Sequence, residues 1–507
     1  MATLLALTVV EPQSSGIGGG GFYLVDDGKG RIETIDGRET APAAAGPDWF
    51  RMNGQYLSVP QAVPGGLSVG VPGNLRLMAK AHARHGKLPW KALFAPAIRL
   101  ARDGFTVTPR LSQFLTRFNR TGALSEAGRA IYYPDGQPAA EGSTIRNPAL
   151  AAFLEHLAAK GADAFYTGAN AAAVAGAVAS APRNPAPMTA ADLASYEAKD
   201  RAPVCTAYRD HRICGMGPPS SGATTVQGTL GLLAQFDLAA LGKDDPRAWH
   251  LIAEAQRLAY ADRERYLADP DHVAVPVAGL LAPAYLAERA HLIAVDQTMP
   301  AVEAGTPEGV TVALADGLTP DVPSTSHFVA VDRRGQAVTL TSTIEGPFGS
   351  GLVVNGYFLN NELTDFSLVP ERAGRLVANR VGAGKRPRSS MAPTLVYGPD
   401  GKLRLVIGAA GGATIPAQVL KAIIGVVDWK LTAQEAIALP VIYAPGGNTV
   451  YVEKGSALEA MIPALAALGH TDVQPRDATF KANAIEIVAG ALAGAADPRS
   501  EGRAVSE

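Results

Sequence analysis

Residues 324–343, STSHFVAVDRRGQAVTLTST, form the stretch that decides how the fold is interpreted. Apolar residues recur on both sides of a polar tight turn at Arg333–Gln336, which predicts two strands paired as an antiparallel hairpin. The segment before it, residues 296–324, is rich in proline and glycine and is expected to be a loop. The loop therefore delivers the chain to Ser324 and Thr325, where the first strand begins.

The rest of the chain mixes hairpins with helices. Residues 21–42 show two strand patterns joined by a polar turn at Asp26–Lys29. Amphipathic helices are predicted near Asn74–His85, within residues 246–269 and at Ile415–Val427. Because helices and strands do not alternate strictly, the sequence predicts an α+β fold of packed layers.

Composition narrows the class of protein. The chain has 507 residues, of which 47% are hydrophobic and 18% are charged, enough for a large buried core. A net charge of −2 and the absence of a long basic run argue against nucleic-acid binding. Cys205 and Cys214 provide neither a disulfide framework nor a metal-binding spacing, so both are expected to be small core residues on adjacent strands.

Neither a membrane span nor an export signal is predicted from the sequence as written. It contains no run of 18 apolar residues, so no membrane-spanning helix is predicted. The first residues, MATLLALTVVEP, have no positively charged region and no cleavage site, and they resemble the last turns of a helix. We expect a cytoplasmic protein for the sequence as written, with a periplasmic or secreted one possible if the N-terminus is truncated.

Gly16, Gly18 and Gly21 match the spacing of a dinucleotide-binding loop. That loop requires a strand before the glycines and a helix after them, and here the order is reversed. We therefore expect the glycines to be architectural, allowing close backbone approach. A nucleotide-dependent oxidoreductase remains as a third hypothesis for the function.

Two arrangements of nucleophile and base are conceivable at the start of the hairpin. His327 lies two residues from Thr325 on the same face of the strand and lacks the reach of a general base; no G-x-S-x-G motif occurs. If the bond between Ser324 and Thr325 is cut, the new α-amine of Thr325 can accept the proton of its own hydroxyl. An α-amine has a pKa near 8, so a useful fraction is neutral at physiological pH.

Ten motifs support the second arrangement. In chain order they are VVEPQSSGIGGGGF (9–22), DGRETAP (36–42), VPGGLSVGVPG (63–73), PPSSG (218–222), TSHFVAVD (325–332), TSTIEGPFGSG (341–351), LNNELTDFS (359–367), GKRPRSSMAPT (384–394), GAAGG (408–412) and ADPRSEGRA (496–504). Together they resemble the γ-glutamyltransferase family of N-terminal nucleophile hydrolases.

The resemblance implies a four-layer αββα sandwich built jointly by two subunits that arise by autocleavage. Here these would be residues 1–324, the large subunit, and residues 325–507, the small subunit, forming one intertwined domain. It implies no cofactor and no metal. The implied partners are a small γ-glutamyl substrate and, for each subunit, the other one.

Four residues match the catalytic positions of the family. Thr325 matches the nucleophile that forms the acyl-enzyme, and Thr343 matches a threonine that hydrogen-bonds it. Gly411 and Gly412 match the pair whose backbone N–H groups form the oxyanion hole, a kind of contact worth roughly 3–4 kcal/mol of barrier lowering.

The substrate-binding positions match as well. Arg38 corresponds to the arginine that pairs with the substrate α-carboxylate, a task that suits a forked guanidinium. Ser389 and Ser390 correspond to serines that donate to the same carboxylate. Asp365 corresponds to the acid that binds the α-ammonium, and Glu362 stands at a Gln-or-Glu position with the same role. The PPSSG motif is expected to be structural.

Three features depart from the family pattern. Glu345 stands where members with glutathione chemistry usually carry asparagine, which indicates tighter cation binding or another amide substrate. The stretch between Phe366 and Pro387 is a few residues shorter than in members that carry a lid, so we expect hydrolysis to exceed transfer. The family also places a strand and a helix before residue 6, and a truncated layer would impair maturation.

The resemblance therefore implies an autoprocessing threonine hydrolase that cleaves γ-glutamyl amides such as glutathione. One alternative keeps the mechanism and changes the amide, to a glutaryl-type or oxamate substrate. Another is a catalytically silent, truncated homologue that folds as a binding or structural protein.

Overall fold

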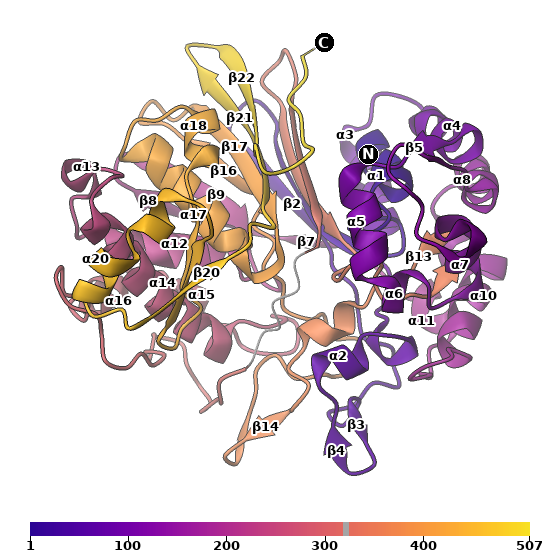
Figure 1. Ribbon diagram of the computed structural model, residues 1–507, viewed down its shortest axis with the longest axis horizontal. Coiled ribbons are helices and arrows are strands. Elements are labelled where there is room, and N and C mark those ends of the chain that lie inside the picture. The colour runs from indigo at the N-terminus through magenta and orange to yellow at the C-terminus, as the bar shows by residue number, and fades with distance from the viewer. Residues whose placement is uncertain (318–323, 507) are drawn as a thin grey trace.

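The computed structural model describes residues 1–317 and 324–506, and two sheets stand face to face in its middle (Figure 1). The first sheet has five strands in the order β10-β11-β1-β2-β7. Their bounds are Ser326–Val331, Ala337–Thr343, Gly20–Asp26, Ile32–Gly37 and Lys199–Arg201. All pairings in this sheet are antiparallel. The hairpin predicted in residues 324–343 is therefore confirmed as β10 and β11.

The second sheet has six strands in the order β22-β21-β17-β16-β9-β8. Their bounds are Ala491–Ala496, Lys481–Val488, Leu403–Ala410, Thr394–Tyr397, His211–Met216 and Pro203–Tyr208. Both sheets contain strands from before Ser324 and strands from after it, so the two parts of the chain build one sandwich.

A helical layer covers the outer face of each sheet (Figure 1). Beside the first sheet lie α1 (Ala2–Val10), α3 (Asn74–His85), α4 (Ala95–Asp103), α8 (Pro148–Lys160) and α10 (Gly168–Ala179). Beside the second lie α12 (Gly222–Leu233), α14 (Pro246–Tyr266), α16 (Pro283–Ala290), α17 (Ile415–Val427) and α18 (Ala433–Ala438). This is the predicted four-layer αββα sandwich, with α3 and α17 at the predicted residues.

Strand β1 shows how the layers share the apolar residues. Tyr23 and Val25 belong to the core under the first helical layer, whereas Phe22 and Leu24 belong to the core on the side of the second sheet. Successive side chains of a strand point to opposite faces, so a strand buried on both faces is apolar throughout.

The glycines of residues 16–21 have a steric purpose. A Cβ added to Gly18 would lie 2.0 Å from the carbonyl oxygen of Phe358, and one added to Gly19 would lie 1.9 Å from that of Thr343. Only glycine permits such an approach of two backbones. The segment leads into β1 and not into a helix, which confirms the architectural interpretation.

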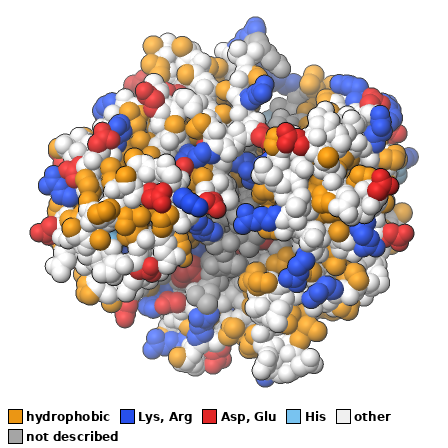
Figure 2. All heavy atoms as spheres, in the orientation of Figure 1, with side chains coloured by type: hydrophobic (Ala, Val, Ile, Leu, Met, Phe, Trp, Pro, Cys, Tyr) orange, Lys and Arg blue, Asp and Glu red, His pale blue; other side chains and the backbone are white. Residues whose placement is uncertain are grey.

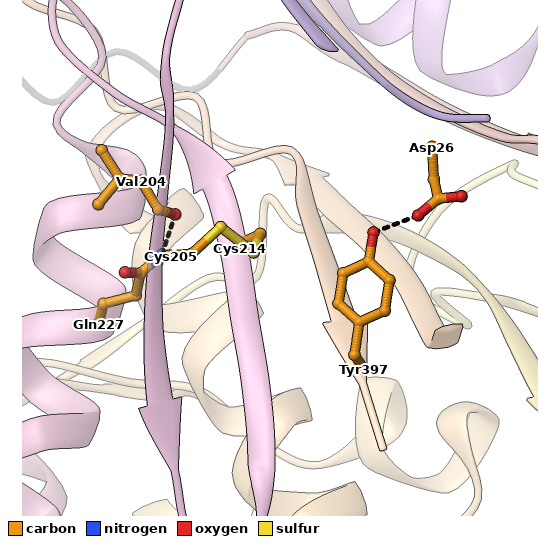
Figure 3. Close-up of a disulfide and its surroundings, with 6 residues drawn as sticks. All are labelled: Asp26, Val204, Cys205, Cys214, Gln227 and Tyr397. Atoms are coloured by element: carbon orange, nitrogen blue, oxygen red, sulfur yellow. Dashed lines mark hydrogen bonds between the residues drawn. A yellow bond between two sulfur atoms is a disulfide. The ribbon is translucent and has the colours of Figure 1, made fainter. Parts of the chain in front are cut away.

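Cys205 and Cys214 differ from their prediction in two respects. They lie opposite each other in neighbouring strands β8 and β9, as expected, but they form a disulfide (Figure 3). Cys214 is fully buried and Cys205 is exposed, so only one of them is a core residue. The spacing of the two cysteines in the sequence does not predict this disulfide. The bond depends on the register of the hairpin, which places the two Cα atoms 4.1 Å apart.

The same view shows a polar link between the sheets. The hydroxyl of Tyr397, in β16, donates to the carboxylate of Asp26, at the end of β1 (Figure 3). On the molecular surface, basic and acidic side chains are interspersed over the face drawn in Figure 2, in keeping with the small net charge. None of the helices in the described ranges is long and apolar enough to cross a bilayer.

Candidate active site

Thr325 lies directly before β10 of the first sheet; residues 318–323 of the predicted loop before it lie outside the described ranges. Its side-chain hydroxyl donates to the hydroxyl of Thr343, at the end of β11, over 3.1 Å. Thr343 also accepts a hydrogen bond of 2.7 Å from the backbone N–H of Glu345. The Thr343 oxygen thus accepts two hydrogen bonds, which fixes its position relative to Thr325.

A pocket of about 340 Å³, including its open mouth, begins at these two threonines. Its walls bring together nearly all the residues predicted for the site, although they come from segments far apart in the sequence. The predicted residues that line it are Arg38, Thr325, Thr343, Glu345, Glu362, Asp365, Ser389, Ser390 and Gly412. Met391, Ala413 and Ile415 complete the wall.

Gly411 does not line the pocket but precedes Gly412 in the turn between β17 and α17. Both have positive φ angles, 137° and 59°, which favour glycine. A Cβ added to Gly411 would lie 2.7 Å from the side-chain nitrogen of Gln418. The turn therefore requires glycine at this position.

Arg38 is fully buried and already surrounded by acceptors. Its guanidinium donates to the carboxylates of Glu362 and, over 2.5 Å, of Asp365. It also donates to the backbone carbonyls of Pro387 and Arg388, each over 3.0 Å. The residue predicted for the substrate carboxylate thus contacts the two acids predicted for the substrate ammonium.

Four carboxyl groups cluster around this one arginine. Burial, opposed by Arg38 and reinforced by Asp365, raises the pKa of Glu362 to about 7. Burial and the neighbouring charge of Glu362 raise the pKa of Glu39, which lies 3.8 Å from Arg38. Burial together with Asp365 and Glu362 also raises the pKa of Glu345. The three shifts share one cause: burial and like-charged neighbours disfavour the ionised form where several carboxyls surround one buried cation.

Ser389 and Ser390 are held by residues that the sequence did not identify as part of the site. The two serines of PPSSG donate to backbone carbonyls of this segment: Ser220 to Met391 over 2.5 Å and Ser221 to Ser389 over 2.6 Å. Arg263, in α14, donates to the hydroxyls of both Ser221 and Ser390. The PPSSG motif is thus structural, as predicted, and its structural task is to hold the pocket wall.

The sequence analysis did not identify two residues that lie next to the predicted site residues. Glu39 follows Arg38 in the DGRETAP motif, and its position beside the predicted arginine was the available signal. Arg263 had no local signal, because it lies on a helix and its contact with Ser390 spans 127 residues. The described part of the chain contains no group of three or more His, Cys, Asp or Glu residues arranged to hold a metal ion.

Comparisons with known proteins identify the family of the chain. The family model described as gamma-glutamyltranspeptidase matches residues 1–506. A glutathione hydrolase proenzyme of Bacillus subtilis (strain 168) is 36% identical over 520 aligned positions, covering 100% of this chain and 86% of the relative. An acylase ACY 1 proenzyme of Pseudomonas sp. (strain V22) is 34% identical, covering 100% and 88%.

A solved structure shows the same architecture. The cephalosporin acylase from Bacillus halodurans superposes with a TM-score of 0.88 at 27% identity, covering 99% of this chain and 89% of that one. The match extends over both sheets and both helical layers. The chain therefore belongs to the gamma-glutamyltranspeptidase family and is an enzyme of the N-terminal nucleophile hydrolase type.

Proposed function

We propose that the chain cuts its own Ser324–Thr325 bond and then uses Thr325 to hydrolyse γ-glutamyl amides, glutathione among them. The observation that carries this proposal is the pocket itself. Its wall combines a threonine hydroxyl that is hydrogen-bonded to a second threonine with the charged side chains of Arg38, Glu362 and Asp365. Such a pocket offers a nucleophile and a charged cradle for an amino-acid head group.

In the proposed reaction, the α-amine of Thr325 accepts the proton of the Thr325 hydroxyl as its oxygen attacks the γ-carbonyl carbon. Backbone N–H groups of Gly411 and Gly412 stabilise the oxyanion. The amide C–N bond breaks, the proton passes to the leaving amine, and an ester to Thr325 remains. Water then attacks the ester, which releases the γ-glutamyl group as a carboxylic acid.

The head group of the substrate would contact both kinds of charge. Its α-ammonium would lie against Asp365 and Glu362, and its α-carboxylate against Arg38, Ser389 and Ser390. Because Ser390 accepts a hydrogen bond of 2.6 Å from Arg263, its own hydroxyl proton remains available to the carboxylate. Arg38 would share its donors between the substrate and the two acids.

We further propose that hydrolysis exceeds transfer to amino-acid acceptors. The segment between Phe366 and Pro387 is described throughout, and none of its residues lines the pocket. Because this segment does not cover the pocket, we expect water to reach the acyl-enzyme at Thr325.

A second candidate keeps the mechanism and changes the substrate to an amide without an α-ammonium. Glu345 favours it, because burial and the neighbouring Asp365 and Glu362 raise the pKa of this carboxyl and so weaken its attraction for an ammonium. The acylases among the relatives and solved structures are similar over the whole chain. The two candidates differ in one measurable quantity, the ratio of kcat/KM for a γ-glutamyl anilide to that for a glutaryl anilide.

The test combines intact mass with this assay, on the wild-type chain and on Thr325→Ala. We expect the wild type to give two fragments with a new N-terminus reading Thr-Ser-His and to hydrolyse the γ-glutamyl anilide. The variant should stay uncut and inactive. An uncut wild-type chain after long incubation would contradict the proposal and favour a silent homologue.

The compartment can also be proposed. Disulfides persist in oxidising surroundings and are rare in the reducing cytosol. The bond between Cys205 and Cys214 therefore supports a periplasmic or secreted location over the cytoplasmic one expected from the sequence as written. Thiol labelling of the denatured protein taken directly from its cells should leave both cysteines unlabelled unless a reductant is added.

A further inference from the structure

The segment Glu11–Ser14, from the VVEPQSSG motif, surrounds the bond proposed to be cut. Ser324, on one side of that bond, donates its hydroxyl to the carbonyl of Gln13 over 2.8 Å. Ser326, on the other side, donates its hydroxyl to the carboxylate of Glu11 over 2.5 Å. One short segment therefore holds both neighbours of Thr325.

An ion pair anchors this segment. Lys481, at the start of β21 in the other sheet, donates to the same carboxylate oxygen of Glu11 over 2.9 Å. The Lys481 side chain is only 9% exposed and that of Glu11 21%. Burial favours the neutral form of Glu11, but Lys481 and the hydrogen bond from Ser326 outweigh it and lower the pKa of Glu11. Glu11 is therefore charged, and one oxygen of its carboxylate accepts hydrogen bonds from both Ser326 and Lys481.

The segment also contacts the residues that follow β11. The carbonyl of Ser14 accepts from the N–H of Ile344, and that of Gln13 accepts from the N–H of Phe348, each over 3.3 Å. Ile344 is the neighbour of Thr343, which holds the Thr325 hydroxyl. The segment thus ties together the bond, the nucleophile and the partner of the nucleophile.

Thr325 itself has a φ of 116°, which a β-branched residue rarely adopts. Such a conformation persists only where the surroundings hold it. The contacts of Ser324 with Gln13, of Ser326 with Glu11 and of Thr325 with Thr343 are the side-chain hydrogen bonds that do so. After cleavage no carbonyl precedes Thr325, and this constraint ends.

We infer that Glu11, Gln13, Ser14 and Lys481 form a maturation clamp, which holds the Ser324–Thr325 bond in the conformation needed for self-cleavage. The inference rests on the proposed autocleavage. In that step the Thr325 oxygen attacks the carbonyl carbon of Ser324, the C–N bond breaks, and the hydroxyl proton moves to the freed amine. Water then hydrolyses the resulting ester to the Ser324 carboxylate. Glu11 and Lys481 are positioning residues, since neither contacts the reacting atoms or lines the substrate pocket.

The test follows the conversion of newly synthesised full-length chain to its fragments in a cell-free system, by denaturing gel and intact mass. Glu11→Gln removes the charge, Ser326→Ala removes the hydroxyl, and Lys481→Met removes the anchor. We expect each to cleave about tenfold or more slowly than the wild type, because small displacements of reacting groups have large effects on rate. The double variant E11Q/S326A should be no slower than the slower single variant, since both remove one contact.

Two controls separate the possible failures. Glu453→Gln breaks a comparably shielded ion pair with Arg499, 2.5 Å long and outside the clamp, and should cleave at the wild-type rate. The fully cleaved fraction of Glu11→Gln should hydrolyse a γ-glutamyl anilide with a kcat within about threefold of the wild type, because the substrate pocket is untouched. Wild-type cleavage rates in E11Q and S326A would overturn the clamp. Equal fold-losses of cleavage rate and of kcat in Glu11→Gln would also overturn it. A wild-type chain that stays uncut would instead overturn the proposed function itself.

Discussion

Thr325 combines two properties that rarely coincide, a β-branched side chain and a positive φ. Holding a residue in such a backbone conformation costs about 1–3 kcal/mol. The conformation persists only where the surrounding structure fixes the backbone. Here the surroundings are hydrogen bonds to the residue and to both of its neighbours. The strain therefore lies at the position that the sequence assigns to self-cleavage.

Thr343 provides the first prediction at this scale. Its hydroxyl holds that of Thr325, so Thr343→Ala should lower kcat for a γ-glutamyl anilide by about 10²-fold, as expected when a catalytic group loses its orientation. Thr343→Ser is the matched control, because it keeps the hydroxyl and should retain most of the activity. Equal losses in the two variants would show that the methyl group matters and the hydrogen bond does not.

Glu345 provides the second prediction at the residue scale. Its pKa is raised by burial and by Asp365 and Glu362, so the folded protein binds its proton more tightly than the unfolded chain does. The contribution of Glu345 to stability is therefore lost as the pH rises above the pKa of a glutamate in the unfolded chain, near 4.3. Glu345→Gln keeps the shape and cannot ionise, so it should raise the free energy of unfolding at pH 7.5 by about 1–3 kcal/mol.

Urea unfolding of the uncut Thr325→Ala chain, with and without Glu345→Gln, measures this difference. The gain should shrink toward zero as the pH approaches 4, where both forms of residue 345 are neutral. A gain that does not change with pH would show that packing, and not ionisation, is the cause.

At the scale of elements, α12 and α14 of the second helical layer hold one wall of the pocket. Ser220 and Ser221 precede α12 and bind the backbone of residues 389–391. Arg263, on α14, binds the side chains of Ser221 and Ser390. A motif without chemistry of its own thus determines where a predicted substrate-binding serine lies.

Arg263 provides the prediction at this scale. Arg263→Gln removes the charged donor to Ser390, so the serine hydroxyl can turn away from the substrate carboxylate. We expect KM for a γ-glutamyl anilide to rise about tenfold, the effect of about 1.4 kcal/mol of lost binding, with a smaller change in kcat.

The contact with Ser390 can be isolated. In a Ser390→Ala background, Arg263→Gln should have no further effect on KM, because the two residues act through one contact. Arg265→Gln, two residues along the same helix and paired with Asp316, is the matched control and should leave KM unchanged. Additive effects of R263Q and S390A would contradict this interpretation.

At the scale of the whole molecule, His327 lies between the two sheets and has no catalytic contact. Its ring bonds the Thr341 hydroxyl over 2.9 Å and covers Gly408, where a Cβ would lie 2.3 Å from the ring. Burial lowers the pKa of His327 to about 3. The histidine is therefore a neutral core residue, consistent with the rejection of a Ser/His arrangement.

This burial predicts acid sensitivity. Below the unfolded pKa of about 6.5, the unfolded chain binds a proton that the folded protein does not bind until the pH approaches 3, so stability falls as the pH falls. One such group contributes a slope of up to about 1.4 kcal/mol per pH unit. His327→Asn, in the uncut Thr325→Ala chain, should flatten the loss of stability between pH 6 and pH 4.

Urea unfolding at several pH values measures the slope. His291→Asn is the control, because His291 is exposed, and it should leave the slope unchanged. An unaltered slope in His327→Asn would show that other groups cause the acid sensitivity.

Much of the architecture was predictable because its causes are local. The hairpin of residues 324–343 follows from alternating polarity around a polar turn, and helices α3 and α17 follow from apolar periodicity within about a dozen residues. The reversed order of glycines and strand excluded a dinucleotide loop for the same reason. The site residues were found through short motifs, each of which also reflects a local backbone or chemical requirement.

The sequence by itself thus predicted the secondary structure around the site, the family resemblance and a set of candidate site residues. Only the tertiary structure decided which charges meet: Arg38 and Glu362 are 324 residues apart, and Glu11 and Lys481 are 470 apart. It likewise decided that two cysteines form a disulfide and that Arg263 reaches Ser390. These contacts depend on how sheets and helices pack in three dimensions, and no periodicity or spacing along the chain encodes that packing locally.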